Sequence, residues 1–375
     1  MTKHLVLLGS GPAHLRLLAL LAQQLLPGVT THIKITLISR NQQHIDTALS
    51  KAFVAGRMKL DACLIDLEPL IQKTRTQWLE VQAVALDANA QALRLADGQK
   101  IHYDWLSIDL EPTHDRQRTE LQLPGACANG LFVRPAPIFC KLWPSVLELA
   151  ATKALRVAVI CDHPGPQEIT GIEWALAIHQ ALPGCAITLI TGGAPLGKAS
   201  SPASACNTSL RALLVKTLKA KKITVLADAA LAIEPGEIAL ASGASLACDV
   251  PVLAIHADPP ALASASALTL DADGFIAVDA ALRSTSHPNV LAATDGDLDG
   301  ALHGAVLAQT LTRMTGLPFA TPTNRRSKLL RGLRFVSSQD GQAIASWGGY
   351  STRGRLAAWL LRGIDQSRMA SYRAN

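Results

Sequence analysis

The chain has 375 residues, 49% hydrophobic and 17% charged, which is more than one hydrophobic core accommodates, so we expect two or three domains. A mean hydropathy of +0.22 excludes a disordered chain, and seven scattered cysteines that never form a CxxC pair argue against a disulfide scaffold and a zinc ribbon. Residues 325–375 carry ten Lys or Arg against two Asp or Glu, so the rest of the chain has a net charge of −2, which argues against nucleic-acid binding.

The first elements along the chain predict a parallel sheet. Leu5–Gly9 is typical of a buried strand, Pro12–Leu26 of a helix and Ile33–Ser39 of a second buried strand. A strand, a glycine turn, a helix and a strand within about 40 residues form a βαβ unit. Short alternating runs in Gln82–Leu110 then predict an antiparallel meander.

The same rhythm begins again near Leu155. The expected elements are strands at Val157–Cys161, Ala186–Thr191 and Ile223–Leu226, helices at Glu168–Ala181 and Ser209–Ala220, a meander over Glu237–Ile255, a strand at Asn289–Ala293 and a helix at Leu298–Thr315. This predicts an internal duplication in an α/β fold: two Rossmann-like three-layer domains in tandem, each with an antiparallel β-meander, plus a C-terminal α+β tail. We expect the first domain in residues 1–130 and 269–324, the second in 131–268 and the tail in 325–375.

The sharpest motif is Gly9-Ser10-Gly11-Pro12-Ala13-His14, which directly follows a strand and opens a helix. The first glycine permits a tight turn, and the second allows the backbone to approach a pyrophosphate at the N-terminus of the helix. His14 replaces the third glycine of the usual pattern. The turn predicts dinucleotide binding, with a purely structural turn as the alternative.

Several stretches give the chain a wider resemblance. They are Gly9–His14, Ile35–Ser39, Ala55-Gly56 with Ile65–Leu67, Ala272–Asp279, Ser286–Asp295 and Ala343–Gly348. On these residues the chain resembles the FAD-dependent pyridine nucleotide-disulfide oxidoreductase superfamily. It is most similar to the type II NADH dehydrogenase-like branch, which includes the FAD domain fused to selenide, water dikinase. The resemblance implies two dinucleotide-binding domains, the first for FAD and the second for NAD(P)H.

The resemblance also implies positions around FAD. Gly9, Ser10, Gly11, Pro12, Ala13 and His14 would face the pyrophosphate, and Ser39 and Arg40 would lie at the adenosine ribose. Asp295, preceded by Thr294 where the family has glycine, would bind the ribitol or pyrophosphate. His303, Gly304 and Ala305 would open the helix whose N-terminus points at the isoalloxazine. Asp109-Leu110-Glu111-Pro112 places a carboxylate where the family has a glycine.

The second domain lacks the nicotinamide motif. After the strand at Val157–Cys161 the chain continues Asp162-His163-Pro164-Gly165-Pro166, with no GxGxxG. Prolines offer no N–H to a phosphate, and the carboxylate would repel it. The resemblance implies NAD(P)H as the donor, whereas these residues argue against a normal NAD(P)H site.

No side chain is identified as catalytic. The chain has no CxxxxC redox pair, which argues against disulfide reductase chemistry, and Cys161 is expected to be a buried small hydrophobe. The histidines are not at metal-ligand spacing, so we expect no metal site. No stretch reaches the roughly 18 apolar residues of a membrane-spanning helix, and the cysteine usage indicates a cytoplasmic compartment.

The tail predicts a basic amphipathic helix. Leu356, Trp359, Leu360 and Ile364 lie at helical spacing, and Arg355, Arg362 and Arg368 lie elsewhere around it. Such a helix either lies on anionic lipid headgroups on the inner face of the cell membrane, or packs on its own domain or on a partner in a homodimer.

The first hypothesis is therefore an FAD-binding oxidoreductase that passes electrons from NAD(P)H or another donor to an acceptor such as quinone. Its partners would be small-molecule or protein electron donors and acceptors, and the flavin would carry the redox chemistry. The alternative is a degenerate relative without catalysis that serves as a binding or scaffolding module. The loss of glycine at Thr294, Glu111 and His256 favours this alternative.

Overall fold

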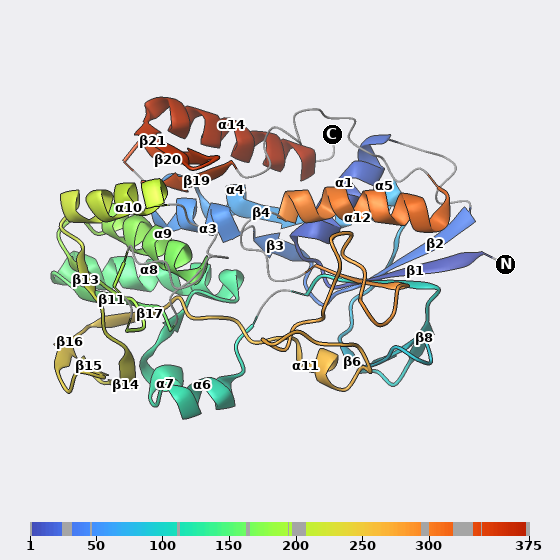
Figure 1. The fold of residues 1–375 in the computed structure, drawn as a ribbon, viewed down its shortest axis with the longest axis horizontal. Coiled ribbons are helices and arrows are strands. Elements are labelled where there is room, and N and C mark those ends of the chain that lie inside the picture. Colours follow the sequence, from blue (N-terminus) through green and yellow to red (C-terminus); the bar gives the residue numbers. More distant parts are fainter. Residues whose placement is uncertain are drawn as a thin grey trace.

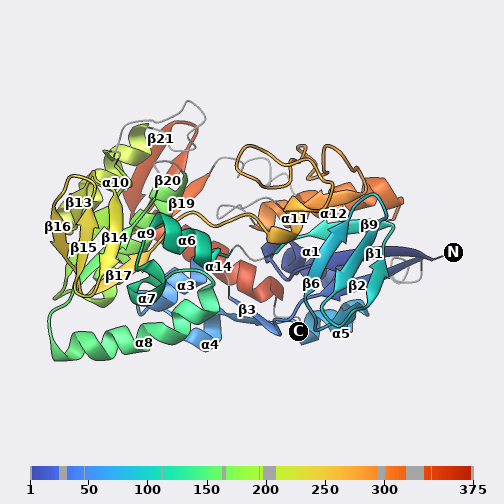
Figure 2. The same cartoon turned by 90° about the horizontal axis from the view of Figure 1, so that it is seen from below.

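The computed structural model describes residues 2–24, 32–45, 47–110, 113–162, 166–193, 195–196, 208–293, 300–317, 333–338 and 340–372. Two lobes lie side by side, and the C-terminal segment rests on both of them (Figures 1 and 2). Thr294, Asp295, Glu111 and residues 163–165, all named above, lie outside the described residues.

A parallel sheet of five strands forms the centre of the first lobe. In pairing order these are β18 (Val290–Ala292), β9 (Trp105–Ile108), β1 (Lys3–Leu8), β2 (Ile33–Ile38) and β5 (Gln77–Leu79). Helices α1 (Pro12–Gln24), α5 (Glu68–Thr74) and α12 (Gly300–Thr315) cover one face. The meander of β6 (Ala83–Asp87), β7 (Ala92–Leu95) and β8 (Lys100–His102) covers the other. The pair β3 (Gln43–Ile45) and β4 (Leu64–Asp66) lies beside α3 (Thr47–Val54) and α4 (Leu60–Cys63).

The second lobe repeats this arrangement. Its parallel sheet has the order β10 (Leu131–Phe132), β17 (Val250–Leu253), β11 (Arg156–Ile160), β12 (Ala186–Ile190) and β13 (Thr224–Leu226). Helices α8 (Ala136–Thr152), α9 (Pro166–Ala181) and α10 (Thr208–Ala220) pack on one face. The meander of β14 (Ala230–Glu234), β15 (Glu237–Leu240) and β16 (Ser245–Ala247) packs on the other.

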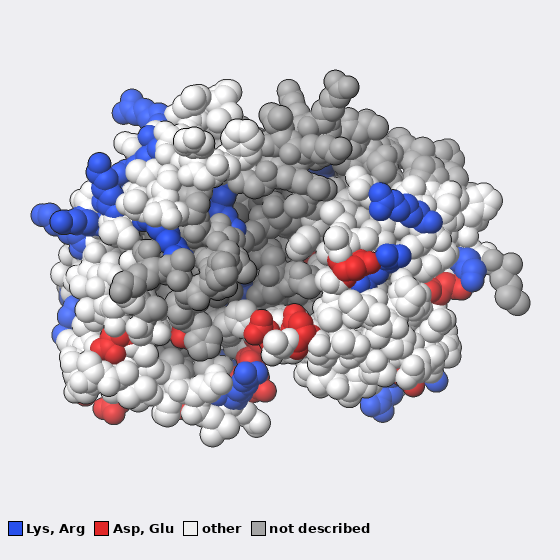
Figure 3. Space-filling model, in the orientation of Figure 1, with Lys and Arg blue, Asp and Glu red and all other residues white. Residues whose placement is uncertain are grey.

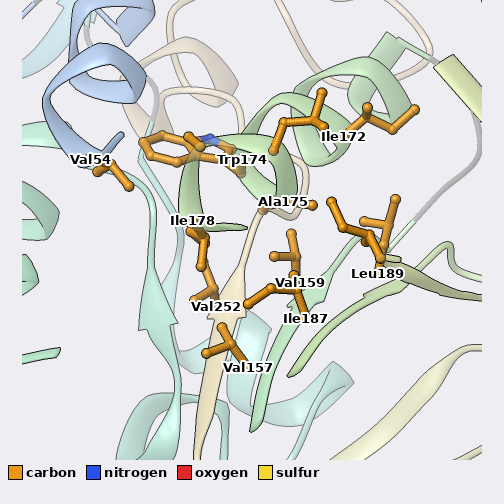
Figure 4. Packing of buried hydrophobic residues seen from close by; sticks show 14 of the residues in the cluster. Val54, Val157, Val159, Ile172, Trp174, Ala175, Ile178, Ile187, Leu189 and Val252 are labelled. Atoms are coloured by element: carbon orange, nitrogen blue, oxygen red, sulfur yellow. The ribbon is translucent and has the colours of Figure 1, made fainter. Parts of the chain in front are cut away.

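Alternating side chains explain why both sheets are covered on two faces. In β1, Leu5 and Leu7 join the core under the helices, while Val6 and Leu8 join the core under the meander. β11 divides its residues in the same way between two cores. Figure 4 shows the helix side of β11, where Val157 and Val159 lie below the α9 side chains. A strand buried on both faces is continuously apolar, which is what made these strands visible in the sequence.

The matching strand orders confirm the predicted α/β class and its internal duplication. Two details differ from the sequence prediction. The last strand of each predicted meander, β9 and β17, belongs to a parallel sheet, because it pairs beside the first strand of its unit.

Two passages of the chain between the lobes, near Thr113 and Asp258, pair with each other. Thr113 and Asp258 form an antiparallel bridge, and Arg118 binds the Asp258 carboxylate at 3.0 Å. Helices α6 (Arg116–Gln122) and α7 (Ala126–Asn129) follow the first passage, and α11 (Ala261–Ser264) follows the second. Figure 3 shows acidic side chains gathered on the surface where the two lobes meet.

The C-terminal segment forms the predicted α+β tail and joins both cores. Strands β19 (Arg334–Ser337), β20 (Ala343–Trp347) and β21 (Tyr350–Gly354) form an antiparallel sheet, and α14 (Arg355–Tyr372) follows. Val336 and Ile344 lie in the helix-side core of the second lobe. Met369 and Tyr372, at the other end of α14, lie in the helix-side core of the first lobe.

Helices α1 and α12 pack closely because of Gly304. A Cβ atom at this position would lie 2.5 Å from Cβ of Arg16 and 2.9 Å from the carbonyl oxygen of Ala13. Neither neighbour is the free end of a flexible side chain. Glycine is therefore required for the spacing of these helices.

We predict that Gly304→Ala lowers the free energy of unfolding by about 1–3 kcal/mol, because the added methyl group overpacks this contact. Thermal or urea unfolding measures the change. Gly363→Ala in α14 is the matched control: nothing lies within 4 Å of its Cβ position, so the substitution should stabilise the helix by about 1 kcal/mol. A neutral Gly304→Ala variant would contradict the close packing.

Candidate functional site

The turn after β1 has a backbone that only glycine adopts without strain. Gly9 has a φ of +93°, and its N–H donates to the carbonyl oxygen of Ile38 at 2.9 Å. A side chain at Gly9 would collide with the carbonyl group of Asp109. The first glycine of the motif is thus fixed by both its conformation and its neighbour.

The carboxylate of Asp109 occupies the N-terminus of α1. Asp109 follows β9, is almost fully buried, and its carbonyl oxygen accepts from the N–H of Gly11 at 3.0 Å. Its carboxylate accepts from the backbone N–H of His14 at 2.9 Å. A Cβ atom at Gly11 would collide with this carboxylate, so the space that the second glycine opens is filled from within the chain. A negative group here is stabilised by unpaired N–H groups and by the helix dipole.

The His14 side chain is fully buried between the turn and β9. Its Nδ1 lies 2.7 Å from the carbonyl oxygen of Gly9 and its Nε2 lies 2.7 Å from Oγ of Ser107 on β9. Burial lowers the pKa of His14 below its ordinary value. Because a carbonyl only accepts, the neutral ring donates from Nδ1 and accepts the Ser107 hydroxyl at Nε2. His14 therefore takes part in the turn through its backbone N–H and through the bond from its ring to Gly9, and the same ring ties the turn after β1 to β9.

The adenosine-end candidates lie beside the turn. The Ser39 hydroxyl, at the end of β2, donates to Oγ of Ser10 at 3.0 Å and accepts from the N–H of Asn41 at 3.2 Å. Arg40 is exposed. The fold thus brings the carboxyl ends of β1 and β2 together, as the parallel topology predicts.

Of the remaining predicted residues, three lie in α12 and two lie outside the described residues. His303, Gly304 and Ala305 lie within α12, which begins at Gly300, and Gly304 faces α1. Thr294 and Asp295 lie outside the described residues. The preceding residue, Ala293, donates its N–H to the carbonyl oxygen of Ile108 at 2.9 Å, so the chain leaves β18 beside Asp109.

The corresponding edge of the second lobe carries a carboxylate as well. Asp162 follows β11, and both of its carboxylate oxygens lie 3.0 Å from the backbone N–H of His256, which follows β17. α9 begins at Pro166, which has no N–H. Gly171 is pressed against Cys161, so this glycine and the buried Cys161 belong to packing between α9 and β11.

An ion pair between the lobes escaped the sequence analysis. Lys51 on α3 binds Glu173 on α9 at 2.5 Å, and 9% and 19% of the two side chains are exposed. The Lys51 ammonium lies 5.9 Å from the centre of the Trp174 ring. Val54, at the end of α3, packs beside Trp174 in the second core (Figure 4). No spacing in the sequence signals a contact between residues 122 positions apart.

The described residues contain neither a candidate metal site nor a candidate membrane span. No group of three or more His, Cys, Asp or Glu is placed to hold a metal ion. None of the described helices combines the length and the apolar character that crossing a membrane requires.

The first lobe has the glycine turn of a dinucleotide motif. The place beside Gly11, where a phosphate would come closest to the backbone, is filled by the Asp109 carboxylate. The turn at Gly9 and the Ser10–Ser39 pair fit the phosphate and ribose ends of a dinucleotide such as FAD. At Gly11 a phosphate fits only once the Asp109 side chain has turned away. The fold and this edge define a protein of two Rossmann-like lobes, the first of which carries the glycine turn.

Comparison with known proteins places the fold. The sequence matches no family model and no curated protein. The structure is similar to sulfide:quinone oxidoreductase from the hyperthermophilic bacterium Aquifex aeolicus, at 16% identity over 100% of this chain and 92% of that chain, with a TM-score of 0.77. It is similar to NDH2 from Plasmodium falciparum, solved in complex with NADH, at 13% identity over 99% and 97% of the two chains (TM-score 0.69).

A third similar structure is putidaredoxin reductase in its covalent complex with putidaredoxin. The identity is 17% over 92% of this chain and 81% of that chain, with a TM-score of 0.68. These similarities confirm the expected fold of two Rossmann-like lobes in tandem.

We predict that acid destabilises the fold partly through His14. Its pKa is lowered by burial, so as the pH falls through about 6.5 the unfolded chain takes up a proton that the folded chain refuses. The unfolding free energy should then fall by at most about 1.4 kcal/mol per pH unit for each such histidine. Burial also lowers the pKa values of His4, His114 and His179, so these histidines change the stability in the same direction.

Urea unfolding between pH 8 and pH 5 measures this effect. His14→Gln should show a shallower loss of stability than the wild type, and His32→Gln, at an exposed position, should follow the wild type. Parallel curves for His14→Gln and the wild type would show that the buried ring is not the source.

Proposed function

We propose that the protein is an FAD-dependent oxidoreductase, with the cofactor on the first lobe. The observation that carries the proposal is the two-lobed fold, shared over nearly the full length with a sulfide:quinone oxidoreductase and with NDH2. The glycine turn at Gly9 supports it. A bound flavin would supply the electron transfer, so no nucleophilic side chain is needed.

The chain's own residues would bind and orient the cofactor. The backbone from Gly9 to His14 would lie at the pyrophosphate, Ser39 and Arg40 at the ribose, and Thr294 and Asp295 beside the phosphates or ribitol. Because the His14 ring is engaged with Gly9 and Ser107, His14 would bind a ligand through its backbone N–H, once the Asp109 carboxylate that accepts from it has turned away. His303 and Ala305 would lie near the flavin end, while Gly304 sets the position of their helix.

The electron donor is the open part of the proposal. The similar NDH2 structure was solved in complex with NADH, which supports NAD(P)H as the donor. Against it, Asp162 places a carboxylate at the edge where a nicotinamide dinucleotide would bind, and α9 starts with a proline. A small reductant or a reduced protein would therefore also fit as the electron donor. The similarity to a sulfide:quinone oxidoreductase supports quinone as the electron acceptor.

One observation favours the alternative of a non-catalytic binding or scaffolding protein. At the edge of each parallel sheet where a dinucleotide would bind, a carboxylate of the chain itself accepts a backbone N–H. These carboxylates are Asp109 in the first lobe and Asp162 in the second. A protein that had lost its cofactors would tolerate such carboxylates.

The first experiment is an absorption spectrum of the purified protein, followed by anaerobic addition of NADH. We expect flavin bands. Bleaching by NADH would establish NADH as a donor, whereas bands that persist with NADH and bleach with another reductant would exclude it. A colourless protein that refuses added FAD would favour the scaffold.

Gly9→Ala tests the location of the cofactor. It should abolish flavin retention, because a side chain at this turn collides with Asp109. Gly98→Ala is the matched control: Gly98 has a φ of +87°, so the backbone strain is similar, but its Cβ position is open. Loss of flavin in both variants would mean that general destabilisation, and not the turn, is responsible.

The surface of the C-terminal segment supports a peripheral position on the cytoplasmic face of a membrane. Ala357 and Ala358 of α14 are buried, whereas large apolar side chains face outward. This α14 patch comprises Leu356, Trp359 and Leu360, with exposed fractions of 70%, 62% and 43%. Arg355 and Arg362 are exposed on the same helix, and Lys and Arg gather on the surface around β21 and α10 (Figure 3). Exposed tryptophan with basic residues suits anionic headgroups.

We predict that the protein sediments with vesicles containing anionic lipid, and less with neutral vesicles or at high salt. Trp359→Ser should weaken this binding several-fold, because the indole ring no longer enters the headgroup layer. Leu121→Ser on α6 is the control, because Leu121 is 84% exposed but lies outside the α14 patch. If Trp359→Ser leaves sedimentation unchanged but abolishes a homodimer, the patch is a subunit interface.

A further inference from the structure

The position of Asp109 makes it a competitor for the cofactor phosphate. Its carboxylate fills the space in front of Gly11 and accepts the N–H of His14, and both groups belong to the proposed phosphate site. We propose that Asp109 is an internal anion that a dinucleotide phosphate must displace, so that this residue sets how tightly FAD is held. The inference rests on the proposed function and deepens it.

Geometry prevents the carboxylate and a phosphate from sharing the site. The second glycine of the motif exists so that a phosphate can come close to the backbone, and here that closest approach is made by the carboxylate. Two negative groups within contact distance also repel one another strongly in a buried setting. Asp109 is almost fully buried, so water screens this repulsion little.

Displacement requires only that the side chain moves. The backbone of Asp109 is held on both sides, since its N–H donates to the carbonyl oxygen of Leu8 at 2.9 Å and its carbonyl accepts from Gly11 at 3.0 Å. These backbone bonds do not involve the carboxylate and can persist when the side chain turns. Rotation of the side chain would free the N–H of His14 for a phosphate oxygen and leave β9 in place.

The second lobe has a similar carboxylate contact, but the strand that carries the carboxylate is the other one of the central pair. Asp109 follows β9 and binds the residues after β1, whereas Asp162 follows β11, the counterpart of β1, and binds the residue after β17, the counterpart of β9. In each lobe, a carboxylate that follows one central strand accepts a backbone N–H from the segment that follows the neighbouring central strand. The recurrence at both edges indicates a built feature of this chain.

Asp109→Asn tests the proposal, because it removes the charge and keeps an oxygen that can accept from His14. Affinities for FAD and for ADP, which has the diphosphate without the flavin, are measured by titration with the full chain. Removing a like charge in contact with the phosphate should tighten both by about tenfold or more. Asp104→Asn is the control: Asp104 also accepts a backbone N–H, from His4 at 2.7 Å, but it precedes β9 at the opposite edge of the sheet.

The outcomes separate this inference from the proposed function. Tighter FAD and ADP binding by Asp109→Asn alone, or binding gained where the wild type has none, supports the competitor role. Unchanged or weaker binding of both ligands, with wild-type FAD binding intact, overturns it and leaves the proposed function standing. Tighter ADP binding without FAD binding in any variant supports the internal anion and overturns the flavin proposal. If Asp109→Asn does not fold, Asp109→Ser is measured in its place with the same criteria.

Discussion

The buried contact between Asp109 and the first turn joins three elements on which the first lobe depends. It connects the end of β9 to the turn after β1 and to the first residues of α1. The His14 ring makes a second link between the same strands through Ser107. Charged and polar groups at such depth persist only when they are paired, so each of these bonds fixes the others. The edge of the sheet is consequently a closed hydrogen-bonded unit rather than an open loop.

This closure explains why the glycine motif alone underdetermines function. Gly9 and Gly11 are needed here even without a ligand, because chain atoms of Asp109 lie where their side chains would be. A turn that binds a dinucleotide and a turn whose helix N-terminus is capped by a carboxylate of the same chain therefore require glycine at the same two positions. What distinguishes them is whether the carboxylate yields to a phosphate, which is a question of relative affinity.

Much of the fold could be predicted from the sequence, and the reasons are local. β1 and β11 are apolar because both faces are covered, and Gly9 needs a positive φ. The long-range contacts could not be predicted. Asp109 lies 95 positions from His14 and Lys51 lies 122 from Glu173, and no periodicity connects such pairs. The direction of the His14 ring depends on Ser107, a small residue on a strand whose neighbours only the fold supplies. The inner face of α14 was also hidden, because alanines fill it while larger apolar residues face outward.

The C-terminal segment has a consequence for how the chain can be divided. Val336 and Ile344 complete the core of the second lobe, and Met369 and Tyr372 complete that of the first. A fragment cut at either passage between the lobes would leave apolar side chains without their covering. A cut at the second passage would also separate the Asp340 carboxylate from Lys221 of the second lobe, which it binds at 3.1 Å, although its bond to Arg353 of β21 at 2.9 Å would remain. Each lobe has its own sheet, yet neither is a self-sufficient folding unit: the last forty residues are a shared component that any exchange of lobes between related proteins would have to carry along.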